Sequence, residues 1–280
     1  MSGVGNEFQV VTRKKWMARK CLSRRNRHIS ESDYLNDCPD VNVDSFTTRL
    51  ERLCGIMSQS DYFMLSMETL QQQLDILKRP LERIVCLGLG PFTRTHQALH
   101  QVAFIVCAQR QHKIKEALYY DPVFRDTEKE LLERLSGTVL TEDRSGRHEA
   151  TVPTLYYLPH CPYALMHNLL LCNWTRENLA NVFLISNSFE MLTLNRIKGR
   201  DADDHITRIT DHCTETVLED DYEQHNVFND LSLHSFPSDK LPAADDNVFW
   251  TCGSPLKVHE DELQTELITE AAMTALSISS

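Results

Sequence analysis

The feature that most constrains the fold is a regular alternation of short apolar segments and amphipathic segments that begins at residue 84. The run Ile84-Val-Cys-Leu-Gly is continuously apolar, as expected of a strand buried in a parallel sheet. Further strands are predicted at 116–121, 138–141, 154–159, 181–186 and 231–235, and helices at 95–110, 127–135, 163–172 and from residue 189. This alternation predicts right-handed βαβ crossovers, and so an α/β fold with a Rossmann-like, doubly wound, mostly parallel sheet.

Two amphipathic helices are predicted ahead of the first strand. Apolar residues recur at three-and-four spacing through residues 46–57, with Asp44 or Ser45 as the expected N-cap. The same spacing runs through residues 62–78, and Pro80 ends it. The predicted sheet therefore carries N-terminal helices, and the 127–135 helix is expected to be capped by Asp126.

Charge and periodicity divide the chain into parts. Residues 1–44 lack hydrophobic periodicity and are expected to form a disordered basic arm and linker ahead of one domain at 45–250. Within that domain, residues 199–226 hold nine Asp or Glu against two Arg, which indicates a mobile acidic insertion or a solvated helix. Residues 251–280 are expected to be an acidic tail, weakly amphipathic over 260–276.

The charge distribution bears on partners. The net charge is −11, but residues 1–27 hold eight Lys or Arg against Glu7 and so contribute +7, which leaves −18 for the remainder. An acidic body repels phosphates, so a general nucleic-acid binder is disfavoured. The arm could be a nuclear-import signal, an RNA-contacting tail or a solvated tail that nothing reads.

Cysteine usage and hydropathy indicate a cellular compartment. The nine cysteines are odd in number and include no C-x-x-C pair, which favours reduced thiols over a disulfide framework. No apolar run approaches the roughly 18 residues that a membrane span needs, and the N-terminus lacks the apolar core of a signal peptide. We expect a protein of the cytoplasm, with the nucleus left open by the basic arm, and no membrane partner.

The clearest functional motif is Leu87-Gly88-Leu89-Gly90-Pro91-Phe92, which joins the first strand to a helix. Glycines there permit a tight turn and a close backbone approach to a ligand, and the helix N-terminus offers N–H groups to an anion. The third glycine of G-x-G-x-x-G is replaced by Thr93. The glycines therefore indicate either a ligand site, with Phe92 at its margin, or a turn and nothing more.

Two further motifs follow strand ends. Asp121 ends the second strand, where an acid accepts hydrogen bonds from ribose in Rossmann folds, or else caps the following turn. Pro159-His160-Cys161-Pro162 follows the fourth strand. With strand order 3-2-1-4-5, the first and fourth strands are neighbours at the switch point, so this turn should face the glycine turn. Catalysis, ligand contact and a purely structural turn all remain open for His160 and Cys161.

The fifth strand is followed by Ser186-Asn187-Ser188-Phe189. Asn187 and Ser188 suit a helix N-cap and would also border the same edge of the sheet. His205, His212, Cys213 and His225 match no zinc module, and solvated histidines explain them better. These motifs predict ligand-binding residues, but neither a catalytic group nor a metal site, and they specify no cofactor.

These motifs together resemble the "sensitivity to red light reduced" family, the SRR-like proteins. The matching blocks are 86–92, 120–124, 158–162, 170–174, 186–189 and 229–237. Carried over position by position, the family's signature residues are Gly88, Gly90, Asp121, Pro122, His160, Cys161, Asn173, Trp174, Asn187, Ser188 and Phe189. Ser186 stands where a glycine is common in the family.

The resemblance implies a regulatory protein associated with circadian clock input and the regulation of haem biosynthesis, in cytoplasm and nucleus. It implies no established enzymatic activity, so whether the chain is an enzyme is left open. An unknown small ligand or protein partner would bind at the carboxyl edge of the sheet. The alternatives are an S-adenosylmethionine-dependent methyltransferase and a haem-responsive regulator with Cys161-Pro162 as the thiolate ligand.

Overall fold

A computed structural model of the chain describes residues 42–196, 204–219 and 221–251. Within these residues a seven-stranded sheet has the order β3-β2-β1-β4-β5-β7-β6. Its strands are β1 (Arg83–Leu87), β2 (Glu116–Tyr120), β3 (Thr138–Val139), β4 (Thr154–Leu158), β5 (Val182–Asn187), β6 (Thr214–Val217) and β7 (Leu231–Ser235). The first five strands are parallel, and β7 runs antiparallel to both of its neighbours. The predicted α/β, Rossmann-like, mostly parallel sheet is confirmed.

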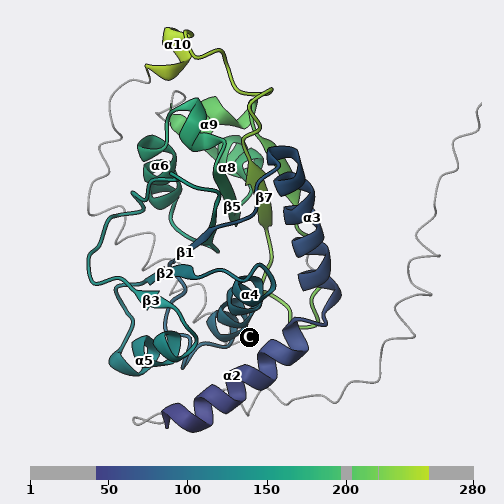
Figure 1. Cartoon of the computed structure of the whole chain (residues 1–280), viewed down its shortest axis with the longest axis vertical. Helices are drawn as coiled ribbons and strands as arrows, with labels where there is room; N and C mark the ends of the chain where they lie inside the picture. The colour runs from purple at the N-terminus through teal and green to yellow at the C-terminus, as the bar shows by residue number, and fades with distance from the viewer. Residues whose placement is uncertain (1–41, 197–203, 220, 252–280) are drawn as a thin grey trace, which may run out of the picture. The chain divides into compact units, whose positions relative to one another are not determined.

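Helices cover both faces of the sheet, as right-handed crossovers require (Figure 1). The helices that precede β3 in the chain are α2 (Val43–Met57), α3 (Asp61–Leu77), α4 (His96–Gln111) and α5 (Asp126–Arg134). The helices that follow β4 in the chain are α6 (Tyr163–Cys172), α7 (Arg176–Leu179), α8 (Phe189–Arg196), α9 (His205–Thr210) and α10 (Asn247–Trp250). The predicted N-terminal helices are thus α2 and α3.

Successive side chains of the central strands pack into two hydrophobic layers, one on each face of the sheet. In β4, Tyr157 stacks on Phe104 of α4, with ring centroids 5.4 Å apart. Its neighbour Tyr156 belongs to the layer on the opposite face, together with Met166 and Leu169 of α6. Because successive strand residues point to opposite faces, one apolar run supplies both layers. This explains why the parallel strands read as continuously apolar segments.

The caps of two helices differ from the prediction. Asn42 caps α2 by accepting a hydrogen bond of 2.9 Å from the backbone N–H of Ser45, so the expected cap at Asp44 or Ser45 is wrong. Asp126 lies inside the first turn of α5, and Arg125 is the N-cap residue. In both cases the chain turns into the helix earlier than the first apolar residue suggests.

The segment expected to be an acidic insertion contains regular structure in its described part. Helix α9 and strand β6 both lie within 199–226, and Ile206 and Ile209 of α9 are fully buried. Strand β6 pairs with β7, so the strand predicted as the sixth, at 231–235, is the seventh in chain order. The sequence Thr-Glu-Thr-Val of β6 is polar because β6 is a partly exposed edge strand, and this hid it from the apolar pattern.

Candidate ligand-binding site

Two glycines turn the chain at the end of β1. Gly88 and Gly90 have φ angles of +70° and +72°, in the left-handed region that strains residues with a side chain. A Cβ atom on Gly88 would lie 2.4 Å from Sγ of Cys161, whereas a Cβ atom on Gly90 would meet nothing within 4 Å. Gly88 is therefore required by both backbone and space, while the backbone at Gly90 has open space beside it.

The carboxylate of Asp121 fastens this glycine turn to the end of β2. Its Oδ2 accepts a hydrogen bond of 2.7 Å from the backbone N–H of Gly90, and its Oδ1 accepts one of 2.9 Å from Val123. Burial raises the pKa of Asp121, although these two backbone hydrogen bonds act in the opposite direction. Of the two predicted roles the structure shows the turn cap, and a ribose would have to use the lone pairs that remain.

The turn after β4 contacts the glycine turn directly, as the predicted sheet order requires. The thiol of Cys161 donates a hydrogen bond of 3.4 Å to the carbonyl oxygen of Leu87, next to Gly88. His160, just before it, has a φ angle of +53° and turns the chain between two prolines. Cys161 is only 6% exposed. A haem iron needs an open thiolate, so this packed sulfur does not fit the haem-ligand hypothesis.

Phe92 anchors the glycine turn to the hydrophobic core. Its side chain is 1% exposed, and its ring lies 6.4 Å from that of Phe46 and 5.8 Å from that of Phe124. The structure thus places Phe92 in the hydrophobic core, with its side chain directed into the packing between α2 and the turn after β2. Its contribution to the predicted site is to hold the glycine turn in place.

Glu128 of α5 is a second anchor that the sequence did not reveal. It is fully buried, and its Oε1 accepts hydrogen bonds from the backbone N–H and the hydroxyl of Thr93, at 3.1 and 2.9 Å. Its Oε2 accepts one of 2.9 Å from the backbone N–H of Arg125. The signal for it is an acid three residues after the helix N-cap, the position of a capping box.

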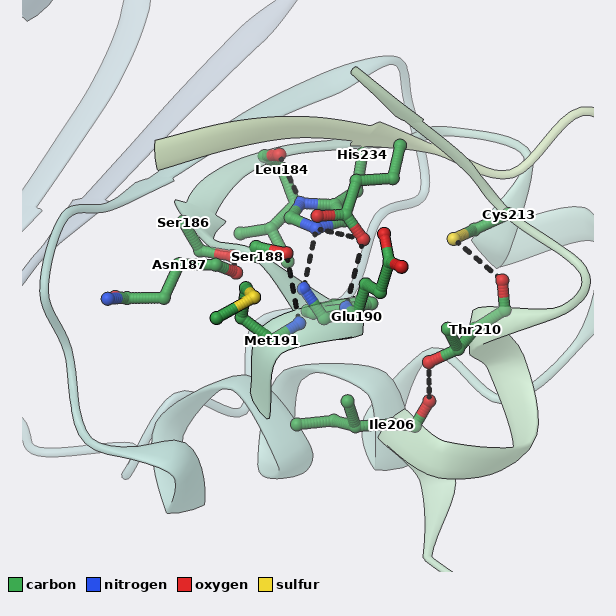
Figure 2. Close-up of polar contacts among 12 residues, drawn as sticks. Leu184, Ser186, Asn187, Ser188, Glu190, Met191, Ile206, Thr210, Cys213 and His234 are labelled. Carbon is green, nitrogen blue, oxygen red and sulfur yellow. Dashed lines mark hydrogen bonds and ion pairs between the residues drawn. The ribbon is translucent and has the colours of Figure 1, made fainter. Parts of the chain in front are cut away.

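Asn187 and Ser188 lie where β5 meets α8. Oγ of Ser188 accepts a hydrogen bond of 3.2 Å from the backbone N–H of Met191, so the predicted N-cap role is confirmed. Oδ1 of Asn187 is buried and has no hydrogen-bond partner among the described residues. Figure 2 shows the Asn187 side chain directed away from His234, on the far side of the turn.

His234 of β7 and Glu215 of β6 hold the first turn of α8 (Figure 2). Nδ1 of His234 lies 3.1 Å from the carbonyl oxygen of Leu184, so this nitrogen carries a hydrogen and donates it. Nε2 lies 3.4 Å from the backbone nitrogen of Phe189 and 3.5 Å from Oε2 of Glu215. Glu215 also accepts a hydrogen bond of 3.2 Å from the backbone N–H of Glu190.

The two contacts of Nε2 require opposite protonation states. Unprotonated Nε2 accepts the hydrogen of Phe189, whereas protonated Nε2 donates to Glu215. Burial raises the pKa of Glu215. The hydrogen bond and charge interaction with His234 act in the opposite direction, as does the Ser188 side chain, and together they lower the pKa of Glu215 to about 2. The carboxylate is therefore ionised at neutral pH. The sequence missed Glu215 because it lies on the polar strand β6.

The predicted residues separate into two groups along the carboxyl edge of the sheet, meaning the ends of β1, β2, β4 and β5. The first group is joined by direct contacts through the glycine turn, and consists of Gly88, Gly90, Asp121 and Cys161. Asn187 and Ser188 form the second, at the end of β5, where Asn187 pairs with Leu231 of β7. The described hydrogen bonds of Ser188 lead to α8 and to Asp230 just before β7, away from the glycine turn.

Two signature positions are structural. Asn173 is fully buried; its Oδ1 accepts a hydrogen bond of 2.7 Å from the backbone N–H of Ala150, and its Nδ2 donates to the carbonyl oxygens of His148 and Leu169. Trp174 stacks on Phe249 of α10, with ring centroids 5.2 Å apart. Asn173 therefore joins the loop before β4 to α6, and Trp174 anchors α10.

A cluster of metal ligands and a membrane-spanning helix are both absent from residues 42–196, 204–219 and 221–251. Nowhere in them do three His, Cys, Asp or Glu side chains gather closely enough to hold a metal ion. Within the same part of the chain, each helix is too short or too polar to cross a membrane.

Comparison with known proteins decides the family. The model of the SRR1 domain matches residues 68–235, which is more than half of the chain. The chain belongs to the SRR1 family. An SRR1-like protein of Drosophila melanogaster is 67% identical over 280 residues, covering 100% of both chains. The resemblance inferred from the sequence blocks is thus confirmed.

More distant SRR1 relatives match over shorter stretches. An SRR1-like protein of Mus musculus is 38% identical over 113 residues, or 39% of this chain and 45% of that protein. The protein SENSITIVITY TO RED LIGHT REDUCED 1 of Arabidopsis thaliana is 34% identical over 111 residues, or 39% of this chain and 40% of that protein. A crystal structure of MtNAS in complex with MTA and tNA covers 70% of this chain and 74% of its own, at 15% identity and a TM-score of 0.32.

Proposed function

We propose that this SRR1-family chain is a regulatory protein that binds a small ligand at the carboxyl edge of its sheet. The observation that carries the proposal is the buried Oδ1 of Asn187, which has no partner among the described residues. Buried polar atoms are nearly always satisfied in folded proteins, so an unsatisfied one at a strand end favours a ligand contact. Its position at the end of β5 is one where ligands bind in doubly wound sheets.

The glycine turn offers a second ligand contact at the same carboxyl edge, at the end of β1, with β4 between it and β5. The backbone of Gly90 has open space beside it, and Asp121 fixes its N–H. Helix α4, which follows the turn, has no side-chain hydrogen bond from its N-cap Thr95 and no acid in its first turn. A helix start of this kind favours an anionic group, so the ligand class is a small molecule with a phosphate or carboxylate.

A thermal-shift panel on the full-length chain tests the proposal. The ligands are S-adenosylmethionine, S-adenosylhomocysteine, NAD(P), nucleotides and haem. A ligand at about 100 times its Kd stabilises the folded state by roughly 2.7 kcal/mol, which gives an easily measured shift. We expect at least one anionic ligand to raise Tm. If none does, the chain is better explained as an interaction protein whose Rossmann-like core is a scaffold for protein partners.

The biological role we propose follows from the family. It is input to the circadian clock and regulation of haem biosynthesis, acting in cytoplasm and nucleus through an unidentified small ligand or protein partner. The name of the Arabidopsis relative, which refers to sensitivity to red light, supports a role in light-linked signalling. The net charge of −11 argues against nucleic acid as the partner.

The basic arm allows a test of localisation. Residues 1–27 lie outside the described residues and hold eight Lys or Arg. Deleting them should leave a fluorescent fusion of the chain in the cytoplasm, whereas the fusion of the full chain should also enter the nucleus. An unchanged distribution would show that the arm plays no part in import.

A methyltransferase that uses S-adenosylmethionine is the second candidate. The glycine turn after β1, the acid after β2 and an antiparallel β7 between β5 and β6 all occur in that class, and this is an analogy of fold. Asp121→Ala tests the ribose contact, because loss of a charge-assisted hydrogen bond should weaken adenosyl binding by about 1–3 kcal/mol. Binding of S-adenosylmethionine with transfer of its labelled methyl group would favour the enzyme.

A further inference from the structure

Away from the carboxyl edge, α2 and α4 bring two cysteine side chains together. The sulfur of Cys107 in α4 lies 3.3 Å from the carbonyl oxygen of Cys54 in α2. The sulfur of Cys54 lies 3.9 Å from the carbonyl oxygen of Ala103, one helical turn before Cys107. The two side chains also interact electrostatically, since each shifts the pKa of the other. Each thiol is thus directed into the partner helix, and both remain free cysteines in this structure.

The surroundings make the two sulfurs chemically unequal. The pKa of Cys107 is lowered by its interaction with the Cys54 side chain and by the guanidinium of Arg110, and these effects outweigh burial. The same interaction raises the pKa of Cys54. Arg110 is held in place by Glu51 of α2 at 2.6 Å, and both of these side chains are about half exposed. A thiolate next to a cation is the form of cysteine that reacts with oxidants.

Cys172 and Cys213 offer a contrast. The thiol of Cys172 donates to the carbonyl oxygen of Leu169, and that of Cys213 donates to the carbonyl oxygen of Thr210. Each of these is a contact within the residue's own local turn, three residues back along the chain. Cys54 and Cys107 differ because they connect two helices that are 53 positions apart in sequence.

We propose that Cys54 and Cys107 form a reversible disulfide that joins α2 to α4, with a hydroperoxide as the oxidant. The Cys107 thiolate attacks the O–O bond of hydrogen peroxide and becomes a sulfenic acid, and the second oxygen leaves as hydroxide, which takes a proton. Cys54 loses its proton and attacks the Cys107 sulfur, which forms the S–S bond and releases the hydroxyl group as water. Two thiols and one hydrogen peroxide give one disulfide and two water molecules, and a dithiol reductant reverses the step.

Peptide mapping of the full-length chain under non-reducing conditions tests the proposal. After limiting hydrogen peroxide, the peptides that contain Cys54 and Cys107 should be linked, and dithiothreitol should release them. The linkage should form equally in the matched controls Cys172→Ser and Cys213→Ser. In Cys54→Ser the link should be lost, and dimedone should label Cys107 as the trapped sulfenic acid.

Two results would overturn the proposal. One is that Cys54 and Cys107 both remain free thiols while other cysteines of the chain are oxidised. The other is that Cys107 links to other cysteines as often as to Cys54. Both results are read from the wild-type chain, so they hold even if a variant fails to fold, which circular dichroism would detect.

The role of the Arg110 guanidinium is tested separately, by the rate of disulfide formation. Arg110→Met keeps much of the side-chain volume and removes the charge, so disulfide formation should slow several-fold. Arg134→Met is the matched control, since Arg134 pairs with Asp44 and Glu130 instead. Equal rates in both variants would contradict the activating role of Arg110.

Discussion

Individual residues at the carboxyl edge are constrained by contacts that the sequence pattern only partly reveals. Gly88 is needed because Cys161 fills the space where its Cβ atom would be, while Gly90 is constrained by its φ angle alone. The sequence indicated both glycines but could not separate these reasons. The contact of Gly88 with Cys161 depends on a turn that lies some 70 residues further along the chain. Asp121 was likewise indicated, but its two backbone partners were not.

The two glycines allow a matched comparison. Gly90→Ala should cost about 1–2 kcal/mol of unfolding free energy, which is the typical cost of a left-handed conformation with a side chain. Gly88→Ala carries the same strain and also a 2.4 Å approach to Cys161, so it should cost clearly more. Chemical denaturation of both variants measures the difference. Equal losses would show that the sulfur moves away without cost.

At the scale of elements, apolar periodicity predicted the five parallel strands and the helices between them. It failed for elements whose residues are largely polar. Strand β6 has the sequence Thr-Glu-Thr-Val and pairs with β7, and α9 lies in the acidic segment and packs on α6. Neither element contains a continuous apolar run, so the apolar pattern did not reveal them. The Glu215–His234 pair was missed for this reason, since its two members come from strands that only the fold brings together.

The Glu215–His234 pair predicts a pH effect on the stability of α8. Because the pKa of Glu215 is lowered to about 2, its contribution is present above the ordinary carboxyl pKa of about 4.5 and is lost as pH falls toward 2. Glu215→Gln should therefore destabilise the chain at pH 7 by about 1–3 kcal/mol. The gap between variant and wild type should narrow as pH falls from 5 to 3, in denaturation curves.

Glu219→Gln is the control for this measurement, because Glu219 is exposed and lies two residues after the end of β6. It should leave the unfolding free energy nearly unchanged across the same pH range. If the gap between Glu215→Gln and the wild type does not depend on pH, the ionised carboxylate is not what holds α8.

At the scale of the whole domain, buried histidines make folding sensitive to acid. His100 of α4 bonds through Nδ1 to the hydroxyl of Tyr222 at 2.6 Å, and burial, with the positive charges of His96 and Arg49, lowers its pKa to about 3. Burial lowers the pKa of His148 to about 4, with smaller effects from Arg144 and Arg83. Both imidazoles are therefore neutral in the folded domain at pH 7.

These two pKa values set the direction of the effect. In the unfolded chain both histidines take up protons near their ordinary pKa of 6.5, so the unfolding free energy should fall as pH drops from about 6.5 toward 3–4. His100→Gln should weaken this pH dependence, and denaturation at several pH values measures it. His225→Gln, at an exposed position, should keep the wild-type slope. The same slope in both variants would contradict a neutral, buried His100.

The central claim, a ligand site at the carboxyl edge, is tested most directly by isothermal titration calorimetry with Asn187→Ala. Asn178→Ala is the matched control, because Asn178 lies in α7, which precedes β5 and so lies at the opposite end of that strand. The titrated ligands are the anionic members of the thermal-shift panel. The account predicts that the ligand that binds the wild type also binds Asn178→Ala, and that Asn187→Ala loses about 1–3 kcal/mol of binding free energy. Equal affinity in all three proteins, or no binding by any of them, would contradict it.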